Sequence, residues 1–238
     1  MDSGKVSAVV DGRTFVLEDG RELRLAGIEV PAAMPSVKDG GPLPAAQAAK
    51  AALEELIVGR EVGLKRLGPE ADRYGRGLVH VFLPRDDTQL WAQRAMVAQG
   101  QARVATRLDR PCAQELLSAE GAARAAGRGL WADPQFRLRP AENPADIVGE
   151  RGRFALIEGK IISVRESGGT VYLNFGRRWT RDLAVTVLKR NERVFTAAGM
   201  ELKKLEGRRV RIRGWVEERG GPRIEAHGPE QIEMAERN

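Results

Sequence analysis

The sequence predicts an α+β fold, mainly β with α, arranged as two domains. Strand-like runs with alternating apolar residues follow one another, and hairpin signals separate them. Three further segments have the spacing of amphipathic helices, and a proline-containing stretch divides the chain into residues 1–133 and 151–238. The chain has 238 residues, enough for two domains of ordinary size.

The first 25 residues predict a meander of three short strands. The runs Val6–Val10 and Thr14–Leu17 flank the turn Asp11-Gly12, and Asp19-Gly20 marks a second turn before a strand at residues 23–25. Asp-Gly between alternating apolar residues is a strong short-range hairpin signal. We therefore expect two consecutive hairpins at the start of the domain.

Three helices and two more strands are expected in the rest of the first domain. Residues 32–44 are rich in proline and glycine, which predicts a surface loop before the first helix. A glycine ends each helical segment, and glycine at this position favours helix termination. The helices are expected at residues 45–58, 89–99 and 112–126, and the strands near 61–66 and 77–83.

Residues 134–150 carry three prolines and mixed charge without periodicity, and this composition predicts a linker. The remaining chain is rich in strand-like runs, with a short helical stretch near 192–205. The expected strands lie near 154–165, 170–175, 183–188, 208–218 and 222–226. Five strands with a helix late in the chain are typical of a small barrel of the oligonucleotide/oligosaccharide-binding (OB) type.

The net charge of +6 is distributed unevenly. Residues 1–150 hold 20 Lys and Arg against 21 Asp and Glu, whereas residues 151–238 hold 19 against 12, a net charge of +7. A basic domain beside a neutral one indicates a polyanionic partner, and the alternative is simply a well-solvated arginine-rich surface.

The sequence contains no run of about 18 apolar residues, so we expect no membrane span. The N-terminus has no apolar signal-peptide stretch. The compartment stays open: cytoplasmic as given, or periplasmic or secreted if a leader has been removed.

Four segments resemble the thermonuclease (staphylococcal-nuclease-like) family in their order and spacing. They are Val10-Asp11-Gly12-Arg13-Thr14-Phe15, the run LRLAGIEVP at residues 23–31, Asp72-Arg73-Tyr74-Gly75-Arg76-Gly77, and Gly129-Leu130-Trp131. The resemblance covers about residues 5–133 and implies a five-stranded barrel with three helices. Both domains are therefore expected to be small five-stranded OB-fold-like barrels.

The resemblance also implies a set of site residues. In such proteins two acidic segments supply calcium ligands and a glutamate that positions water, while two arginines hold the phosphate. Arg24 and Arg76 match the arginine positions, which suit bidentate phosphate contacts. Glu29 matches the second acidic position, one methylene longer than the usual aspartate, and Asp11 matches the first aspartate of the turn.

Two positions depart from the family pattern. Arg13 replaces a ligand aspartate, which changes the local charge by two units and repels a cation. Ala32 replaces the glutamate and cannot position water. We therefore expect the catalytic positions Arg24, Glu29 and Arg76 to be impaired, and we expect no cofactor. Calcium, held by Asp11 and Glu29, is expected only if the family site survives.

Arg13 has two interpretations. With Arg24 and Arg76 it would form a phosphate-binding pocket of three guanidinium groups that needs no metal. Alternatively, it points to solvent from its turn and pairs with Asp11 or Glu29. The sequence leaves both open.

Two segments of the second domain combine arginine with aromatic residues. Alternation along residues 209–216 predicts an outward face opposite the core, and a basic turn follows the strand at 170–175. A stacking surface beside positive charge is typical of single-strand-binding barrels. The candidate nucleic-acid-binding residues are Tyr172, Arg177, Arg178, Trp179, Arg209, Arg211, Arg213 and Trp215.

These patterns favour a protein that binds nucleic acid, DNA or RNA, or another polyanion, with little or no metal-dependent phosphodiester hydrolysis. One alternative is an active nuclease with altered metal use. Another is a scaffold in a protein assembly, for which the sequence indicates no particular partner. Whether the chain is an enzyme is thus left uncertain.

Overall fold

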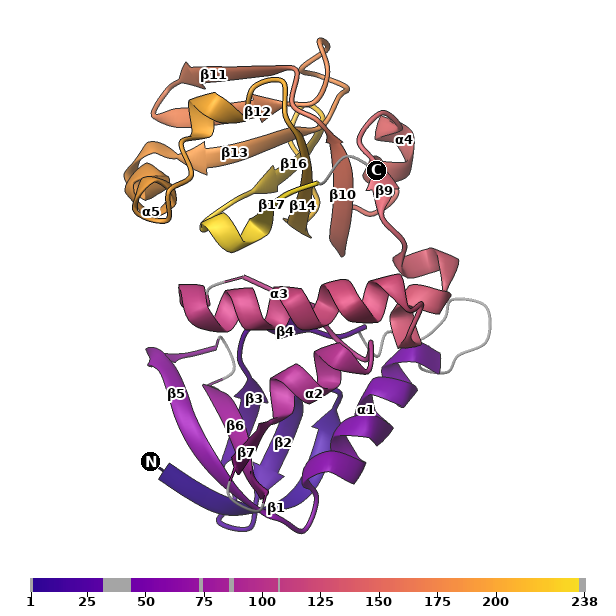
Figure 1. Cartoon of the computed structure of the whole chain (residues 1–238), viewed down its shortest axis with the longest axis vertical. Helices are drawn as coiled ribbons and strands as arrows, with labels where there is room; N and C mark the ends of the chain where they lie inside the picture. The colour runs from indigo at the N-terminus through magenta and orange to yellow at the C-terminus, as the bar shows by residue number, and fades with distance from the viewer. Residues whose placement is uncertain (1, 32–43, 73–74, 86–87, 107, 236–238) are drawn as a thin grey trace. The chain divides into compact units, whose positions relative to one another are not determined.

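The computed structural model describes residues 2–31, 44–72, 75–85, 88–106 and 108–235. Its contacts divide the chain into two compact units. The first unit comprises residues 1–104 and 111–133, and the second comprises residues 105–110 and 134–238. Figure 1 shows three helices on the barrel of the first unit and a strand-rich second unit.

The first unit contains a closed five-stranded barrel. The strands of the whole unit are β1 (Asp2–Asp11), β2 (Thr14–Leu17), β3 (Glu22–Leu25), β4 (Ile28–Glu29), β5 (Glu61–Ala71), β6 (Gly77–Arg85), β7 (Thr88–Trp91) and β8 (Arg103–Val104). The barrel itself consists of β1, β2, β3, β5 and β6. The helices are α1 (Pro44–Ile57), α2 (Ala92–Ala98) and α3 (Arg110–Ala125). The strand order is β3-β2-β1-β5-β6-β7, and parallel pairing of β3 with β6 closes the barrel. β4 and β8 form a separate pair. The predicted barrel with three helices is confirmed.

The spacing of apolar residues accounts for these elements. On β2 the alternate residues Phe15 and Leu17 are buried in the core. On α1 the buried residues Ala49, Leu53 and Ile57 recur every four positions, which places them on one face. The barrel core thus forms between the strand interior and one stripe of α1.

The helix predicted at residues 89–99 begins only at Ala92. Gln89 and Leu90 instead pair with Pro84 and Leu83 in the hairpin of β6 and β7. The helical spacing of apolar residues carries no information about hydrogen bonds to a neighbouring strand. These bonds make Gln89 and Leu90 part of β7 and not of the helix.

The second unit is built from two sheets. The strands are β9 (Arg139–Pro140), β10 (Phe154–Lys160), β11 (Ser163–Ser167), β12 (Thr170–Asn174), β13 (Ala184–Leu188), β14 (Arg209–Trp215), β15 (Glu217–Glu218), β16 (Pro222–Glu225) and β17 (Ile232–Met234). The helices are α4 (Pro144–Val148) and α5 (Glu192–Ala197). One sheet has the order β17-β14-β10-β9 and the other β11-β12-β13-β16-β15, with β13 and β16 parallel.

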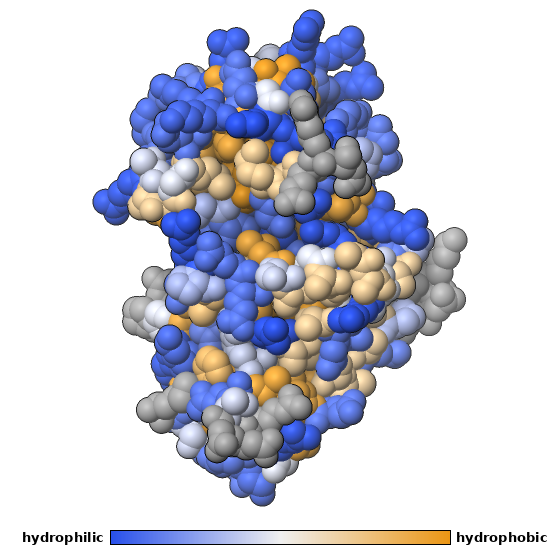
Figure 2. All heavy atoms as spheres, viewed as in Figure 1, coloured by the Kyte–Doolittle hydropathy of each residue, from blue (hydrophilic) through white to orange (hydrophobic). Residues whose placement is uncertain are grey.

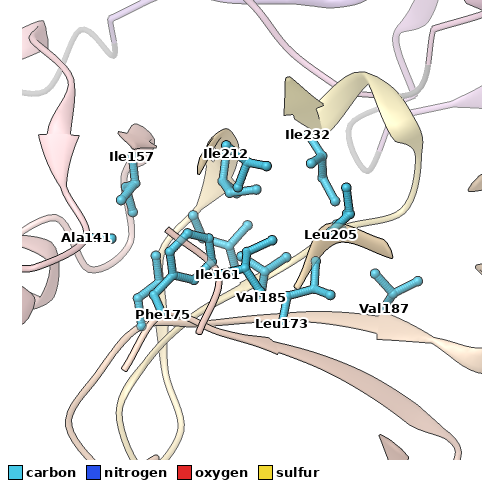
Figure 3. Packing of buried hydrophobic residues seen from close by; sticks show 14 of the residues in the cluster. Ala141, Ile157, Ile161, Leu173, Phe175, Val185, Val187, Leu205, Ile212 and Ile232 are labelled. Carbon is cyan, nitrogen blue, oxygen red and sulfur yellow. The ribbon is translucent and has the colours of Figure 1, made fainter. Parts of the chain in front are cut away.

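Both sheets of the second unit contribute to one hydrophobic core. Figure 3 shows Ile157 and Ile212 from the first sheet beside Leu173 and Val185 from the second. The expected run at residues 154–165 is broken after Lys160 into β10 and β11, so that one bent segment serves both sheets.

Residues 134–150, predicted to be a linker, instead form part of the second unit. They contain β9 and α4, and β9 pairs with β10. Ala141 and Ile147 are buried in the core of this unit. Two isolated apolar residues among prolines give no periodic signal, which is why the sequence pattern missed them.

In the view of Figure 2 hydrophilic residues predominate on the surface. Within the described part of the chain no helix is both long and apolar enough to cross a membrane.

The buried amide of Gln93 yields a first prediction. Its Oε1 accepts a hydrogen bond from the Val81 amide at 3.1 Å, and its Nε2 donates to the Val79 carbonyl at 2.8 Å. Gln93→Leu is expected to lower the free energy of unfolding by about 2 kcal/mol or more, because buried backbone groups lose their partner. Urea-induced unfolding measures it. Gln99→Leu, an exposed position at the end of the same helix, is the control and should cost less than about 0.5 kcal/mol. Equal losses in both variants would contradict this role.

Candidate polyanion-binding site

The turn between β1 and β2 is organised by Asp11. Its Oδ1 accepts the amide of Arg13 at 2.9 Å, and its Oδ2 accepts the hydroxyl of Thr14 at 3.1 Å. Gly12 lies against α1, where an added Cβ would stand 2.7 Å from the Cβ of Ala49. The close approach of the turn to α1 therefore requires glycine at position 12. The Asp11 carboxylate is engaged in holding the turn.

Arg13 points from this turn to Glu29. Its Nη1 lies 2.5 Å from Glu29 Oε2 and also donates to the carbonyl of Ile28 at 3.3 Å. Glu29 is buried on β4, with 7% of its surface exposed. Of the two interpretations of Arg13, the pairing with Glu29 is present, and its side chain is directed inward rather than to solvent.

Arg24 and Arg76 converge on Asp72. Arg24 Nη1 donates to Asp72 Oδ2 at 3.3 Å, and Arg76 Nε donates to the same oxygen at 2.8 Å. The Arg76 amide also donates to Asp72 Oδ1 at 3.1 Å, so this carboxylate holds both the backbone and the side chain of Arg76. Parallel pairing of β3 with β6 brings the two arginines together, although 51 positions lie between them in the chain.

Arg24 lies close to two other guanidinium groups. Burial lowers the pKa of Arg24, and the neighbouring cations of Arg13 and Arg76 lower it further. We call Arg13, Arg24 and Arg76 the arginine cluster; each of its members is also paired with a carboxylate, Glu29, Asp72 or Glu22. An anion entering the cluster would relieve the repulsion between Arg24 and its neighbouring cations.

Glu29 is the acidic group inside the cluster. Burial raises its pKa above the ordinary value of 4.5, and the cations of Arg13, Arg24 and Arg103 oppose the rise. Arg103 is buried on β8 directly opposite Glu29 in the β4–β8 pair. The sequence pattern did not identify Arg103 or Asp72 as members of this site. Asp72 begins the family-like segment at residues 72–77, but Arg103 becomes recognisable only once the two short strands pair.

These residues do not fit a calcium ion well. Calcium prefers about six to eight oxygen ligands with several carboxylates among them. Asp11 holds the turn and Glu29 is paired with a guanidinium. Among the described residues no group of three or more His, Cys, Asp or Glu side chains is placed to hold a metal. Ala32, the other changed position, lies outside the described residues.

The arginine stripe predicted on β14 is not a free basic face. Arg213 was expected to point outward, yet it is fully buried and its guanidinium pairs with Glu233. Arg211 pairs with Glu158 at 2.9 Å and with Glu233 at 3.7 Å. Arg209 also pairs with Glu158, at 3.0 Å. The acidic partners come from the flanking strands β10 and β17, so cross-strand pairs neutralise the stripe.

The aromatic candidates of the second unit have different surroundings. Trp215 is half exposed and its ring contacts Phe154 edge-on, with 6.2 Å between ring centroids. Tyr172 on β12 is half-buried, and the guanidinium of Arg223 lies over its ring at 5.9 Å. Trp179 is 77% exposed. Arg177 and Arg178, in the same turn, are exposed too.

Residues 22–133 match the family model described as staphylococcal nuclease homologue. The first unit, a closed five-stranded barrel with helices, is therefore similar to that family over these residues. The turn carrying Asp11 and Arg13 precedes the matched residues, and the second unit mostly follows them. A comparison with curated proteins finds no match to the chain.

The Arg13–Glu29 pair leads to a prediction about titration. Arg13→Met is expected to raise the pKa of Glu29 further, because burial persists while the cation that opposes it most is removed. NMR titration of labelled glutamate carboxyl carbons measures this. Arg60→Met, an exposed position, serves as the control and should leave the pKa of Glu29 unchanged. A lower pKa in Arg13→Met would contradict the described geometry.

The same shift sets the sign of a stability effect. Because the pKa of Glu29 is raised in the folded state, its contribution to stability is fully present below about pH 4.5 and is lost as pH rises through the folded-state pKa. Glu29→Gln should remove this part of the pH dependence of the unfolding free energy.

Proposed function

We propose that the thermonuclease-like domain binds nucleic acid, or another polyanion, through Arg13, Arg24 and Arg76, and that it performs little or no metal-dependent phosphodiester hydrolysis. The observation that carries the proposal is the ion pair between Arg13 and the buried Glu29. A guanidinium occupies the position where a cation-dependent mechanism would need negative charge.

The arginine cluster suits phosphate for three reasons. Asp72 holds Arg24 and Arg76 in place before any ligand arrives, which reduces the entropy lost on binding. The hydrogen bond from Arg24 to Asp72 uses one of the five donors of a guanidinium, so other donors of Arg24 can face a ligand. The cations of Arg13 and Arg76 lower the pKa of Arg24, and an added anion would offset this repulsion.

Hydrolysis needs more than phosphate binding. A general base or a bound cation must activate the attacking water, and charge must be stabilised around the reacting phosphate. Asp11 and Glu29 are the two family-position carboxylates of the described site, and both are engaged by neighbouring groups. The arginines that would stabilise charge are retained, whereas a group to activate water is missing from these contacts. Binding without turnover follows.

The second unit contributes the excess positive charge of the chain. We assign it to the OB type, because both of its sheets contribute to one core and β13 runs parallel to β16. Salt-sensitive association with a polyanion is then a property of both units. The active-nuclease and scaffold alternatives have no specific contact in their favour, and the following experiment separates them.

The purified full chain, incubated with single-stranded DNA and RNA, is expected to bind without cleavage in calcium, in magnesium and in chelator. Arg24→Ala should weaken binding about tenfold, since a charge-assisted contact to phosphate is lost. Arg21→Ala removes the same charge from a neighbouring turn, where it pairs with Asp2 and Asp19, and is the control. Metal-dependent cleavage that disappears in Arg24→Ala or Arg76→Ala would establish the nuclease alternative instead.

A companion variant tests the cause of the impairment. Arg13→Asp combined with Ala32→Glu restores the family's acidic residues and is expected to gain calcium-dependent cleavage. Absence of any gain would mean that the two substitutions are not what silences the site.

A further inference from the structure

The most exposed large hydrophobic side chain of the described residues lies in the turn between β12 and β13. We call residues 176–182 the Trp179 loop; Trp179 is 77% exposed. Arg177, Arg178 and Arg181 in the same loop are exposed as well. Among the described residues, no carboxylate lies within ion-pair distance of these three guanidinium groups, in contrast to the arginines of β14.

The loop is held in one shape by its own contacts. Asp182 Oδ2 accepts the amide of Arg178 at 2.8 Å, and the amides of Arg181 and Asp182 both donate to the Arg178 carbonyl. Gly176 lies against the carboxylate of Asp182, where an added Cβ would stand 2.0 Å from Oδ2. Trp179 is therefore presented outward by an ordered turn.

The turn between β15 and β16 supports the loop from the side. Gly221 approaches the backbone of Trp179, and an added Cβ there would lie 3.1 Å from the Trp179 carbonyl oxygen. The backbone of the tryptophan is thus braced, while most of its ring stays exposed. An exposed aromatic ring beside guanidinium groups combines a stacking surface with positive charge.

The sheet beside the loop carries further planar groups. Tyr172 on β12 has the Arg223 guanidinium over its ring, and the exposed Arg165 is its cross-strand partner on β11. β12 ends at Asn174, two residues before the Trp179 loop begins. Tyr172, Arg165 and Arg223 therefore lie on strands next to the loop or on their pairing partners.

We propose that the Trp179 loop binds single-stranded nucleic acid, with a base stacked on Trp179 and phosphates contacted by Arg177, Arg178 and Arg181. The inference rests on the proposed function and adds the place and the strandedness. Bases of a single strand expose their faces to an aromatic ring, whereas those of a duplex are stacked on each other. The loop arginines differ from Arg211 and Arg213 of β14, whose guanidinium groups are already paired with Glu158 and Glu233. A membrane surface is less suitable, because the loop offers a single apolar side chain among charges.

The test uses the full chain and a labelled oligothymidylate of about 15 nucleotides, close to the upper site size of one OB barrel. Trp179→Ala is expected to weaken binding about tenfold, and Trp179→Phe to retain most of the affinity, because a stacking surface remains. A duplex of the same length should bind more weakly than the single strand, and its affinity should not depend on Trp179.

Charge is tested separately from stacking. Arg177→Ala with Arg178→Ala should reduce the slope of log affinity against log salt by about 0.7 for each arginine. Arg190→Ala with Arg193→Ala removes the same charge from another exposed part of the unit and should leave the affinity within about twofold. Equal effects of the two pairs would overturn the assignment of the loop.

The outcomes distinguish this inference from the proposed function. If the unaltered chain binds the oligonucleotide and Trp179→Ala binds equally well, the loop assignment is wrong while polyanion binding stands. If the unaltered chain binds no nucleic acid, both are wrong. Binding to vesicles of phosphatidylglycerol without binding to the oligonucleotide would replace the nucleic acid by a lipid surface and overturn the inference.

Discussion

The ion pair between Arg13 and Glu29 is the constraint on which the account of the first unit depends. A buried carboxylate in a barrel wall is costly unless a cation compensates it. In this chain the cation is part of the protein, 2.5 Å away on the adjoining turn. Arg24 and Arg103 add to the same compensation. Under the proposed function, this guanidinium supplies the positive charge that the resemblance assigns to a bound metal.

The barrel determines that this pair can form. Asp11 and Gly12 shape the turn so that it lies against α1, and from there Arg13 reaches β4. Glu120 on α3 accepts the amide of Val104 at 2.7 Å and so ties β8, the partner of β4, to the helix. A helix, a hairpin and a two-residue strand thus converge on one carboxylate. Substitutions at Gly12 or Glu120, which hold the turn and β8 in place, would therefore disturb the site.

Much of the first unit could be predicted from the sequence. Motif spacing located the barrel, and it identified Arg24 and Arg76, which the structure brings together. The sequence did not decide whether Arg13 pairs with Asp11 or with Glu29, because both carboxylates belong to the segments that the resemblance places at one site. Asp72 and Arg103 were missed, since their roles depend on strand pairing rather than on local pattern.

The second unit shows the limit of periodicity. Alternation correctly separated the two faces of β14, but it could not show that Glu158 and Glu233 stand beside the arginines on adjacent strands. Arg213, expected on the outward face, is fully buried and pairs with Glu233. The prediction of a basic turn around Trp179 depended only on local sequence. The high exposure of Trp179 agrees with that prediction.

Calorimetric titration of the full chain with calcium tests the central claim most directly. If Arg13 supplies the charge that compensates Glu29, calcium should produce no saturable heat that depends on Glu29. A single saturable site that is lost in Glu29→Gln, and that binds more tightly in Arg13→Ala, would mean that the ion displaces the guanidinium. The account of a metal-independent site would then be wrong.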